Sequence, residues 1–240
     1  SPGNFVKCVR DLTRQYNNLW GTPNKEPENQ DYYIVTLLND SPLTTQQDFL
    51  QTIDKNGHQE FIYKYDIFNT DPTQNIGDLE DANQINDFIN DMEKIEWKAH
   101  LITADGGKDK DTDRKDYDYE EWIHLPLFYG EIITALFTQA IGGTFILKIY
   151  DTKYINTINL LYILKTFYKN VYIKKPYNSR ITNTEKYVYC EDFIGINDNK
   201  ELLKENMFKV LKKLKDDYIK FDEDYKASVG QSERVINDTF

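Results

Sequence analysis

The sequence predicts an α/β fold in which helices flank an open sheet. Between Ile141 and Cys190, short runs of β-branched and aromatic residues alternate with a longer run that has apolar residues at helical spacing. In chain order these predict a strand at 144–150, a helix at 155–168, and strands at 171–173 and 186–190. Such a series is typical of the C-terminal half of an open α/β sheet.

Glycine and polar residues separate these elements. Gly142-Gly143 predicts a turn before the first strand, and the polar segment 174–185 predicts a loop between the last two. The same patterns predict helices at 6–20, 81–94, 122–140 and 199–226, a strand at 31–38, and a strand at 98–107 that leads into a glycine turn. The charged run 108–121 predicts a mobile, solvated loop, and 228–238 a frayed tail.

The composition narrows the class of protein. With 240 residues and 40% hydrophobic content, the chain can form one α/β domain with an appendage. It has no apolar run of membrane-spanning length, so we expect no membrane partner. Cys8 and Cys190 lie in apolar patterns typical of reduced thiols, which favours a cytoplasmic or nuclear protein. We expect no metal, because His58, His100 and His124 are isolated and more typical of structural positions.

The net charge of −11 argues against a non-specific nucleic-acid binder, because such proteins are basic overall. An RNA enzyme would need a local basic surface instead. One cluster of basic residues offers it: Lys165, Lys169, Lys174, Lys175, Arg180 and Lys186.

Lys148 lies at the centre of a strand that is otherwise apolar. An ammonium there must reach a partner or a cavity, because an unpaired buried charge is costly. It is either an edge lysine whose side chain extends to water or a functional amine near the carboxyl end of a strand, where open α/β sheets bind ligands. Asp105 also follows a predicted strand, just before Gly106-Gly107. Standing alone, an Asp-Gly-Gly sequence commonly marks only a turn.

Three separated segments together resemble one family. These are LITADGG (101–107), GGTFILKIY (142–150) and KPYNSRITNTEKY (175–187), and they are similar to motifs of the FtsJ-like ribose 2′-O-methyltransferases. The likeness is closest to the mRNA-cap-modifying members of large DNA viruses and covers residues 1–195. It implies a Rossmann-like methyltransferase sheet, S-adenosylmethionine as cofactor without a metal, and RNA, specifically capped mRNA, as partner.

The resemblance also assigns roles to residues. The family's catalytic Lys-Asp-Lys-Glu set is matched by Asp105, Lys148 and Glu185, but its first lysine has no counterpart here. For the cofactor, Pro2, Gly3, Asn4 and Phe5 match the family's positions at the methionine part and Asp78 its position beside the adenine, and Asp105 is a further candidate. Asn39 is a candidate for the ribose because it is a polar residue at the end of a predicted strand. For RNA, Lys175, Ser179 and Arg180 match the family's substrate loop, and Lys174 is a candidate as the basic residue next to it. On local grounds, an ordinary turn at 2–5, an Asx turn at 39–40, and helix capping by Asp78 or Asp81 remain open.

We expect a methyltransferase domain at 1–195 and a helical extension at 196–240. The family's first strand is missing from the chain, so we expect the rest of a larger polypeptide, or a second subunit, to complete the sheet. Two other functions remain open: 2′-O-methylation of ribosomal or transfer RNA, and a catalytically inactive binding or scaffold subunit with the methyltransferase fold.

Overall fold

The computed structural model describes residues 77–108, 119–177, 179, 182–197 and 199–237. The chain divides into two compact units, Ser1–Asp78 and Leu79–Phe240, and the elements below all belong to the second. The predicted helix at 6–20 and strand at 31–38 lie outside the described residues, as do the cofactor-binding positions 2–5 and 39.

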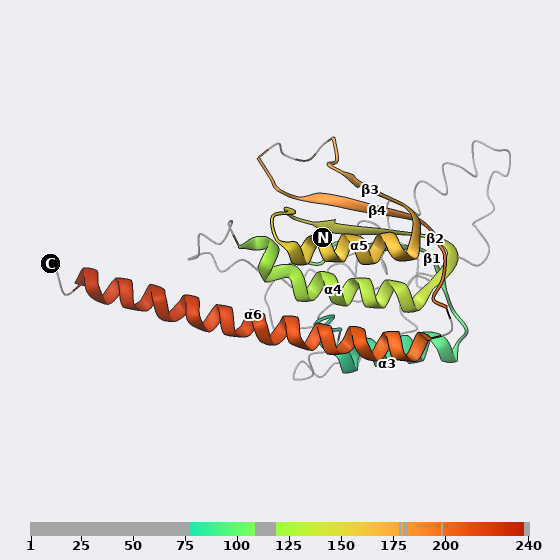
Figure 1. Cartoon of the computed structure of the whole chain (residues 1–240), viewed down its shortest axis with the longest axis horizontal. Coiled ribbons are helices and arrows are strands. Elements are labelled where there is room, and N and C mark those ends of the chain that lie inside the picture. The colour runs from blue at the N-terminus through green and yellow to red at the C-terminus, as the bar shows by residue number, and fades with distance from the viewer. Residues whose placement is uncertain (1–76, 109–118, 178, 180–181, 198, 238–240) are drawn as a thin grey trace, which may run out of the picture. The chain divides into compact units, whose positions relative to one another are not determined.

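The second unit contains a four-stranded sheet with the order β1-β2-β4-β3 (Figure 1). β1 (Ala99–Ala104) runs parallel to β2 (Gln139–Ile149), and β4 (Lys186–Phe193) is antiparallel to both β2 and β3 (Tyr168–Lys174). A helical crossover joins the two parallel strands, as the predicted α/β class requires.

Three helices follow the predicted positions closely, and they form the core with the sheet. α3 (Ala82–Lys94) and α5 (Ile155–Phe167) pack beside α4 (Glu120–Thr138), which is buried along nearly its whole length. A helix that is apolar all round is a core helix. The buried residues that share this core include Phe128, Ile132, Leu136, Phe145, Leu147, Ile149, Leu160, Leu164, Val188 and Cys190.

The predicted solvated loop at 108–121 is wrong at its end. Residues 109–118 lie outside the described part, but Glu120 and Glu121 are buried in the first turn of α4. The carboxylate of Glu121 accepts hydrogen bonds from the backbone N–H groups of Lys153 (2.9 Å) and Tyr154 (3.0 Å). These groups lie immediately before α5, with Tyr154 at its N-cap, so the buried carboxylate of Glu121 caps the entry to that helix from another element.

Gly142-Gly143 does not form the predicted turn. Both glycines lie within β2, at a shift in its pairing with β1. Ala99 pairs with Gln139 and Leu101 pairs with Thr144, so β2 contains extra residues between the two pairs. Gly142 has a φ of +79°, a left-handed conformation that glycine adopts without strain. The pair therefore permits an irregularity inside the strand, as glycine often does.

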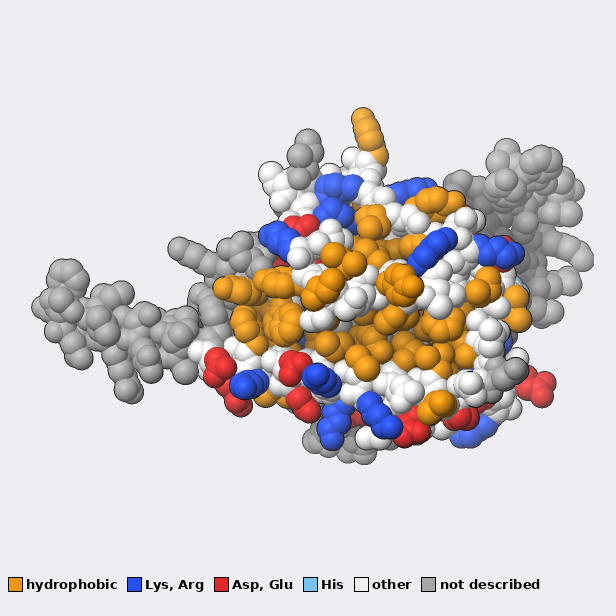
Figure 2. Space-filling view, viewed as in Figure 1, with side chains coloured by type: hydrophobic (Ala, Val, Ile, Leu, Met, Phe, Trp, Pro, Cys, Tyr) orange, Lys and Arg blue, Asp and Glu red, His pale blue; other side chains and the backbone are white. Residues whose placement is uncertain are grey.

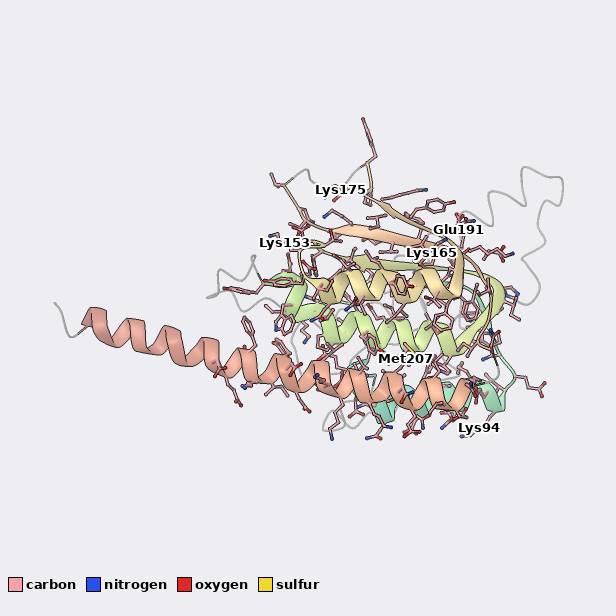
Figure 3. The ribbon with its side chains drawn as sticks, viewed as in Figure 1. Lys94, Lys153, Lys165, Lys175, Glu191 and Met207 are labelled. Carbon is pink, nitrogen blue, oxygen red and sulfur yellow. The ribbon has the colours of Figure 1, made fainter. Side chains whose placement is uncertain are left out.

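The two ends of the unit also refine the prediction. Asp81 caps α3, its carboxylate accepting from the backbone N–H of Asn83 at 2.8 Å, which confirms the capping alternative for Asp81. α6 (Lys200–Asn237) is longer than predicted, and the segment expected to be a frayed tail is helical to Asn237. Met207 of α6 points toward α4 and is buried (Figure 3).

The surface separates into regions of different character. Figure 2 shows hydrophobic side chains over α5 and α4, Lys and Arg over β3 and β4, and a mixture of basic and acidic side chains over α6. The apolar region includes Ile155, Ile158 and Tyr162 of α5, all exposed. None of the described helices combines the length and apolar character needed to cross a membrane.

Candidate active site

The three candidate catalytic residues meet at one edge of the sheet. Asp105 follows β1, Lys148 lies near the end of β2, and Glu185 directly precedes β4. Because β1 and β2 are parallel and β4 is antiparallel to them, the ends of the first two strands and the start of the third share this edge. The edge is the one where open α/β sheets bind their ligands.

Lys148 is held by Asp105 through two contacts. Its Nζ lies 2.9 Å from Asp105 Oδ1 and donates a hydrogen bond to the Asp105 main-chain oxygen at 3.1 Å. Lys148 is only 8% exposed and belongs to an inner strand, so the alternative of an edge lysine reaching water is wrong. Along β2 it alternates with Leu147 and Ile149, which face the helical core, so it points to the opposite face.

Tyr187 is a member of the site that the sequence did not reveal. It pairs with Lys148 across β2 and β4, and its hydroxyl lies 3.0 Å from Glu185 Oε1 and 3.4 Å from Asp105 Oδ1. Burial raises the pKa of the Tyr187 phenol, and the carboxylates of Asp105 and Glu185 raise it further. The phenol therefore stays protonated at neutral pH and can donate to either carboxylate.

The residues after Asp105 are fixed by buried groups. Gly106 donates its N–H to Oε1 of Glu131, a buried residue of α4, at 2.9 Å. A Cβ at Gly107 would lie 3.7 Å from Lys148 Nζ, so glycine keeps the space beside the ammonium open. Burial raises the pKa of Glu131 to about 8, against the opposing effects of the Gly106 N–H and Lys148. Glu131 was not among the predicted site residues.

Lys108 ties the same turn to three other elements. Its backbone N–H donates to His124 Nε2 at 3.1 Å, while His124 Nδ1 lies 2.7 Å from the Glu120 carbonyl oxygen. The Lys108 ammonium pairs with Glu80 at 2.7 Å and lies 4.0 Å from the ring centroid of Tyr218 in α6. His124 thus has the structural role expected of it, since both ring nitrogens hold backbone groups.

The predicted RNA-binding residues are not equivalent. Lys175, at the end of the β3 hairpin in Figure 3, donates to the backbone oxygens of Asn183 and Glu185, the latter at 3.1 Å. It therefore holds the loop that carries Glu185. Lys174 lies over the rings of Tyr189 (5.0 Å) and Tyr172 (5.6 Å).

The remaining predicted positions are less informative. The backbone N–H of Ser179 donates to the Pro176 oxygen at 3.0 Å, and Arg180 lies outside the described residues. Asp78 belongs to the first compact unit, and its role in cofactor binding stays a prediction.

A family model described as FtsJ-like methyltransferase matches residues 1–193. The chain belongs to this family. The match covers all three motifs and confirms the resemblance inferred from the sequence.

Curated relatives agree with this family. The chain is 32% identical over 127 residues to the probable methyltransferase EP424R of African swine fever virus, covering 53% of this chain and 29% of that protein. It is 34% identical over 128 residues to mouse cap-specific mRNA (nucleoside-2′-O-)-methyltransferase 2, covering 53% and 16%. It is 35% identical over 97 residues to cap-specific mRNA (nucleoside-2′-O-)-methyltransferase 1 of Trypanosoma brucei brucei, covering 40% and 26%. In each case the match spans less than a third of the relative's length.

The candidate site of this FtsJ-like methyltransferase combines a lysine, two carboxylates and a phenol. Within the described ranges, no group of three or more His, Cys, Asp or Glu side chains could hold a metal ion. An ammonium at this edge can stabilise negative charge that develops on a bound oxygen, and the Asp105 carboxylate orients the ammonium. The catalytic roles of Asp105, Lys148 and Glu185 remain predictions that this geometry permits.

Proposed function

We propose that this FtsJ-like methyltransferase transfers a methyl group from S-adenosylmethionine to a ribose 2′-hydroxyl of RNA, at the cap-proximal nucleotide of mRNA. The observation that carries the proposal is the ion pair between buried Lys148 and the more exposed Asp105, at the carboxyl edge of β1 and β2. The two relatives named as cap-specific mRNA methyltransferases support this substrate over ribosomal or transfer RNA.

The described residues fit the cofactor. When bound, S-adenosylmethionine supplies an electrophilic methyl group on a positively charged sulfonium. Asp105 places a carboxylate at the sheet edge, and Gly107 leaves the space beside Lys148 without a side chain. Within the second unit, Asp105 is the residue that would contact the cofactor.

Lys148 would activate the hydroxyl. A ribose 2′-hydroxyl is a poor nucleophile because its pKa lies far above neutrality, so the reaction benefits from stabilising the oxyanion or removing the proton. Lys148 is paired as an ammonium with Asp105, its Nζ lying 2.9 Å from Asp105 Oδ1. In this form Lys148 stabilises the developing alkoxide, while its position fixes the attacking oxygen.

The RNA would approach over β3 and β4. Lys174 lies on the same sheet face as Lys148, because it pairs with Tyr187, which in turn pairs with Lys148. Figure 2 shows Lys and Arg side chains over these strands with few acidic ones beside them, so the local charge suits a phosphate backbone although the whole chain is acidic. Lys175 would act indirectly, by holding the loop that carries Glu185.

The test measures methyl transfer from labelled S-adenosylmethionine in the complete natural polypeptide. Its substrates are short capped RNA, the same RNA already 2′-O-methylated at the first nucleotide, and uncapped RNA. The variants are Lys148→Ala, Lys148→Arg and, as matched control, Lys153→Ala, which removes an exposed lysine outside the Lys148–Asp105 cluster. We expect transfer to the unmodified capped RNA alone, lost in Lys148→Ala and retained in Lys153→Ala.

The outcomes separate the alternatives. Lys148→Arg keeps the positive charge but cannot act as a base, so partial activity would support stabilisation of the alkoxide. Equal transfer to uncapped RNA would contradict the cap-proximal substrate and favour ribosomal or transfer RNA. Binding of S-adenosylmethionine without any transfer would contradict the proposed activity and indicate a scaffold subunit.

A further inference from the structure

Glu131 is a buried acid in the largely apolar middle of α4. It is 5% exposed, and its neighbours along α4 include Ile132 and Ile133, which are fully buried. Oε1 accepts the hydrogen bond from Gly106, and Oε2 has no hydrogen-bond partner among the described residues. Burying a carboxyl group costs free energy, so this position calls for an explanation beyond packing.

The explanation lies in the peptide bond between Asp105 and Gly106. Its carbonyl oxygen accepts from Lys148 Nζ at 3.1 Å, and its N–H donates to Glu131 Oε1 at 2.9 Å. The C=O and N–H groups of a planar trans peptide point in opposite directions. Lys148 and Glu131 therefore hold the same peptide from its two sides, and rotation of that peptide would disturb both.

The orientation of this peptide matters for the catalytic pair. Lys148 contacts residue 105 twice, through the main-chain oxygen and through Oδ1 at 2.9 Å. If the peptide turned, the first contact would break and the Asp105 side chain would move relative to the ammonium. Losing the Glu131 acceptor would also leave a donor without its partner next to the site, which favours such a rearrangement.

Gly106 and Glu131 are matched to each other. A Cβ at Gly106 would lie 2.5 Å from Glu131 Oε1 and 3.0 Å from Leu127 Cδ2. The φ of Gly106 is not in the left-handed region, so the backbone conformation does not demand glycine there. Glycine is required at position 106 because the Glu131 carboxyl group lies too close for a Cβ.

The protonation state of Glu131 suits this task. Burial raises its pKa to about 8 and the Asp105 carboxylate adds to the rise, whereas the Gly106 N–H and Lys148 oppose it. At neutral pH the group is therefore mostly a neutral acid. It accepts the hydrogen bond without becoming a second anion that competes with Asp105 for the Lys148 ammonium.

We propose that Glu131 is a positioning residue for Lys148 and Asp105, acting through its hydrogen bond to the peptide between Asp105 and Gly106. It touches no reacting atom. The catalytic readout of this inference rests on the proposed methyl transfer, but its structural readout does not.

The first experiment compares Glu131→Gln with Glu131→Leu in the complete polypeptide. Gln is neutral and keeps the acceptor, whereas Leu has similar volume and no acceptor. We expect Glu131→Gln to keep kcat within about threefold, and Glu131→Leu to lower kcat by roughly 10- to 100-fold, the equivalent of about 1.4–3 kcal/mol for one lost hydrogen bond beside charged groups. The KM values for RNA and S-adenosylmethionine should change by less than about threefold in both variants. Wild-type kcat in Glu131→Leu, or equal loss in both variants, would overturn the proposal.

The second readout is amide hydrogen exchange of the segment 101–108, followed by mass spectrometry. Glu131→Leu should increase exchange in this segment, while Glu131→Gln should leave it protected. This measurement needs no activity. If wild type and both variants were inactive, the proposed function would be contradicted. The exchange data would still decide whether Glu131 positions the peptide. Unchanged protection in Glu131→Leu would overturn that role.

A double-mutant cycle covers the case in which Glu131→Leu does not fold. Gly106→Ala introduces the Cβ that meets Glu131 Oε1, so its cost should fall when the carboxyl group is removed by Glu131→Ala. We expect the loss of thermal stability in the double variant to be smaller than the sum of the two single losses. Strict additivity would show that the two residues do not act on each other, contrary to the proposal.

Discussion

Glu121 links the start of α4 to the start of α5, and its removal should destabilise the fold measurably. Its buried carboxylate accepts two backbone hydrogen bonds, at 2.9 Å from Lys153 and 3.0 Å from Tyr154. Hydrogen bonds to charged groups contribute roughly 1.5–3 kcal/mol each, so Glu121→Ala should cost about 3–6 kcal/mol. For a protein of this size, each kcal/mol shifts the melting temperature by about 2–4 °C, which predicts a fall of at least 6 °C.

The assay is thermal unfolding followed by circular dichroism at neutral pH. Glu121→Gln keeps one acceptor oxygen but turns an amide donor toward a backbone donor, so it should fall between wild type and Glu121→Ala. The matched control is Glu205→Ala, which removes an exposed carboxylate paired with Lys209 on α6 and should leave the midpoint unchanged. A shift of less than about 2 °C in Glu121→Ala would refute the capping role.

Three further predictions concern the site and its support. Tyr187→Phe removes the donor 3.0 Å from Glu185, and steady-state kinetics should show a kcat lower by roughly 10-fold with an unchanged melting temperature; an unchanged kcat would show that the hydroxyl is dispensable. Gly130→Ala would place a Cβ 1.7 Å from the Leu79 main-chain oxygen, so its unfolding midpoint in urea should fall well below that of wild type, and an equal midpoint would contradict this packing. The raised pKa of Glu131, about 8 against an ordinary 4.5, contributes stability that is fully present below pH 4.5 and is lost as the pH rises to about 8. Glu131→Gln should therefore gain stability relative to wild type between pH 5 and pH 8, and a constant difference in melting temperature would contradict the raised pKa.

Local sequence patterns predicted most of the elements but not their irregularities. β2, β3 and β4 stand out as runs of β-branched and aromatic residues, and α3, α4 and α5 as apolar residues at helical spacing. The Gly142-Gly143 pair was misinterpreted because two glycines permit both a turn and an irregularity within a strand. Glu120 and Glu121 were misinterpreted because the partner that makes the burial of Glu121 favourable, the start of α5, lies some 30 residues along the chain.

The candidate site shows a similar division. Lys148 is conspicuous by its own chemistry, as a lysine in an apolar strand, whereas the roles of Asp105 and Glu185 came from the family resemblance. Glu131 had a comparable signal that was not used, because it is an acid within the apolar run FYGEIITALF. Tyr187 had only a weak signal, since it follows Glu185 by two positions and so shares its face in an extended segment.

What no local pattern could supply is the order of the strands. If consecutive strands were neighbours, β3 would lie beside β2, and β4 would be one strand further from Lys148, a displacement of about 4.8 Å. Instead β4 lies between them, and Tyr187 pairs directly with Lys148. Only this order brings the hydroxyl of Tyr187 within 3.4 Å of Asp105, across the strand that carries the lysine. The convergence of an aspartate, a lysine, a glutamate and a tyrosine is therefore a property of the topology, and the antiparallel insertion of β4 is the feature that creates it.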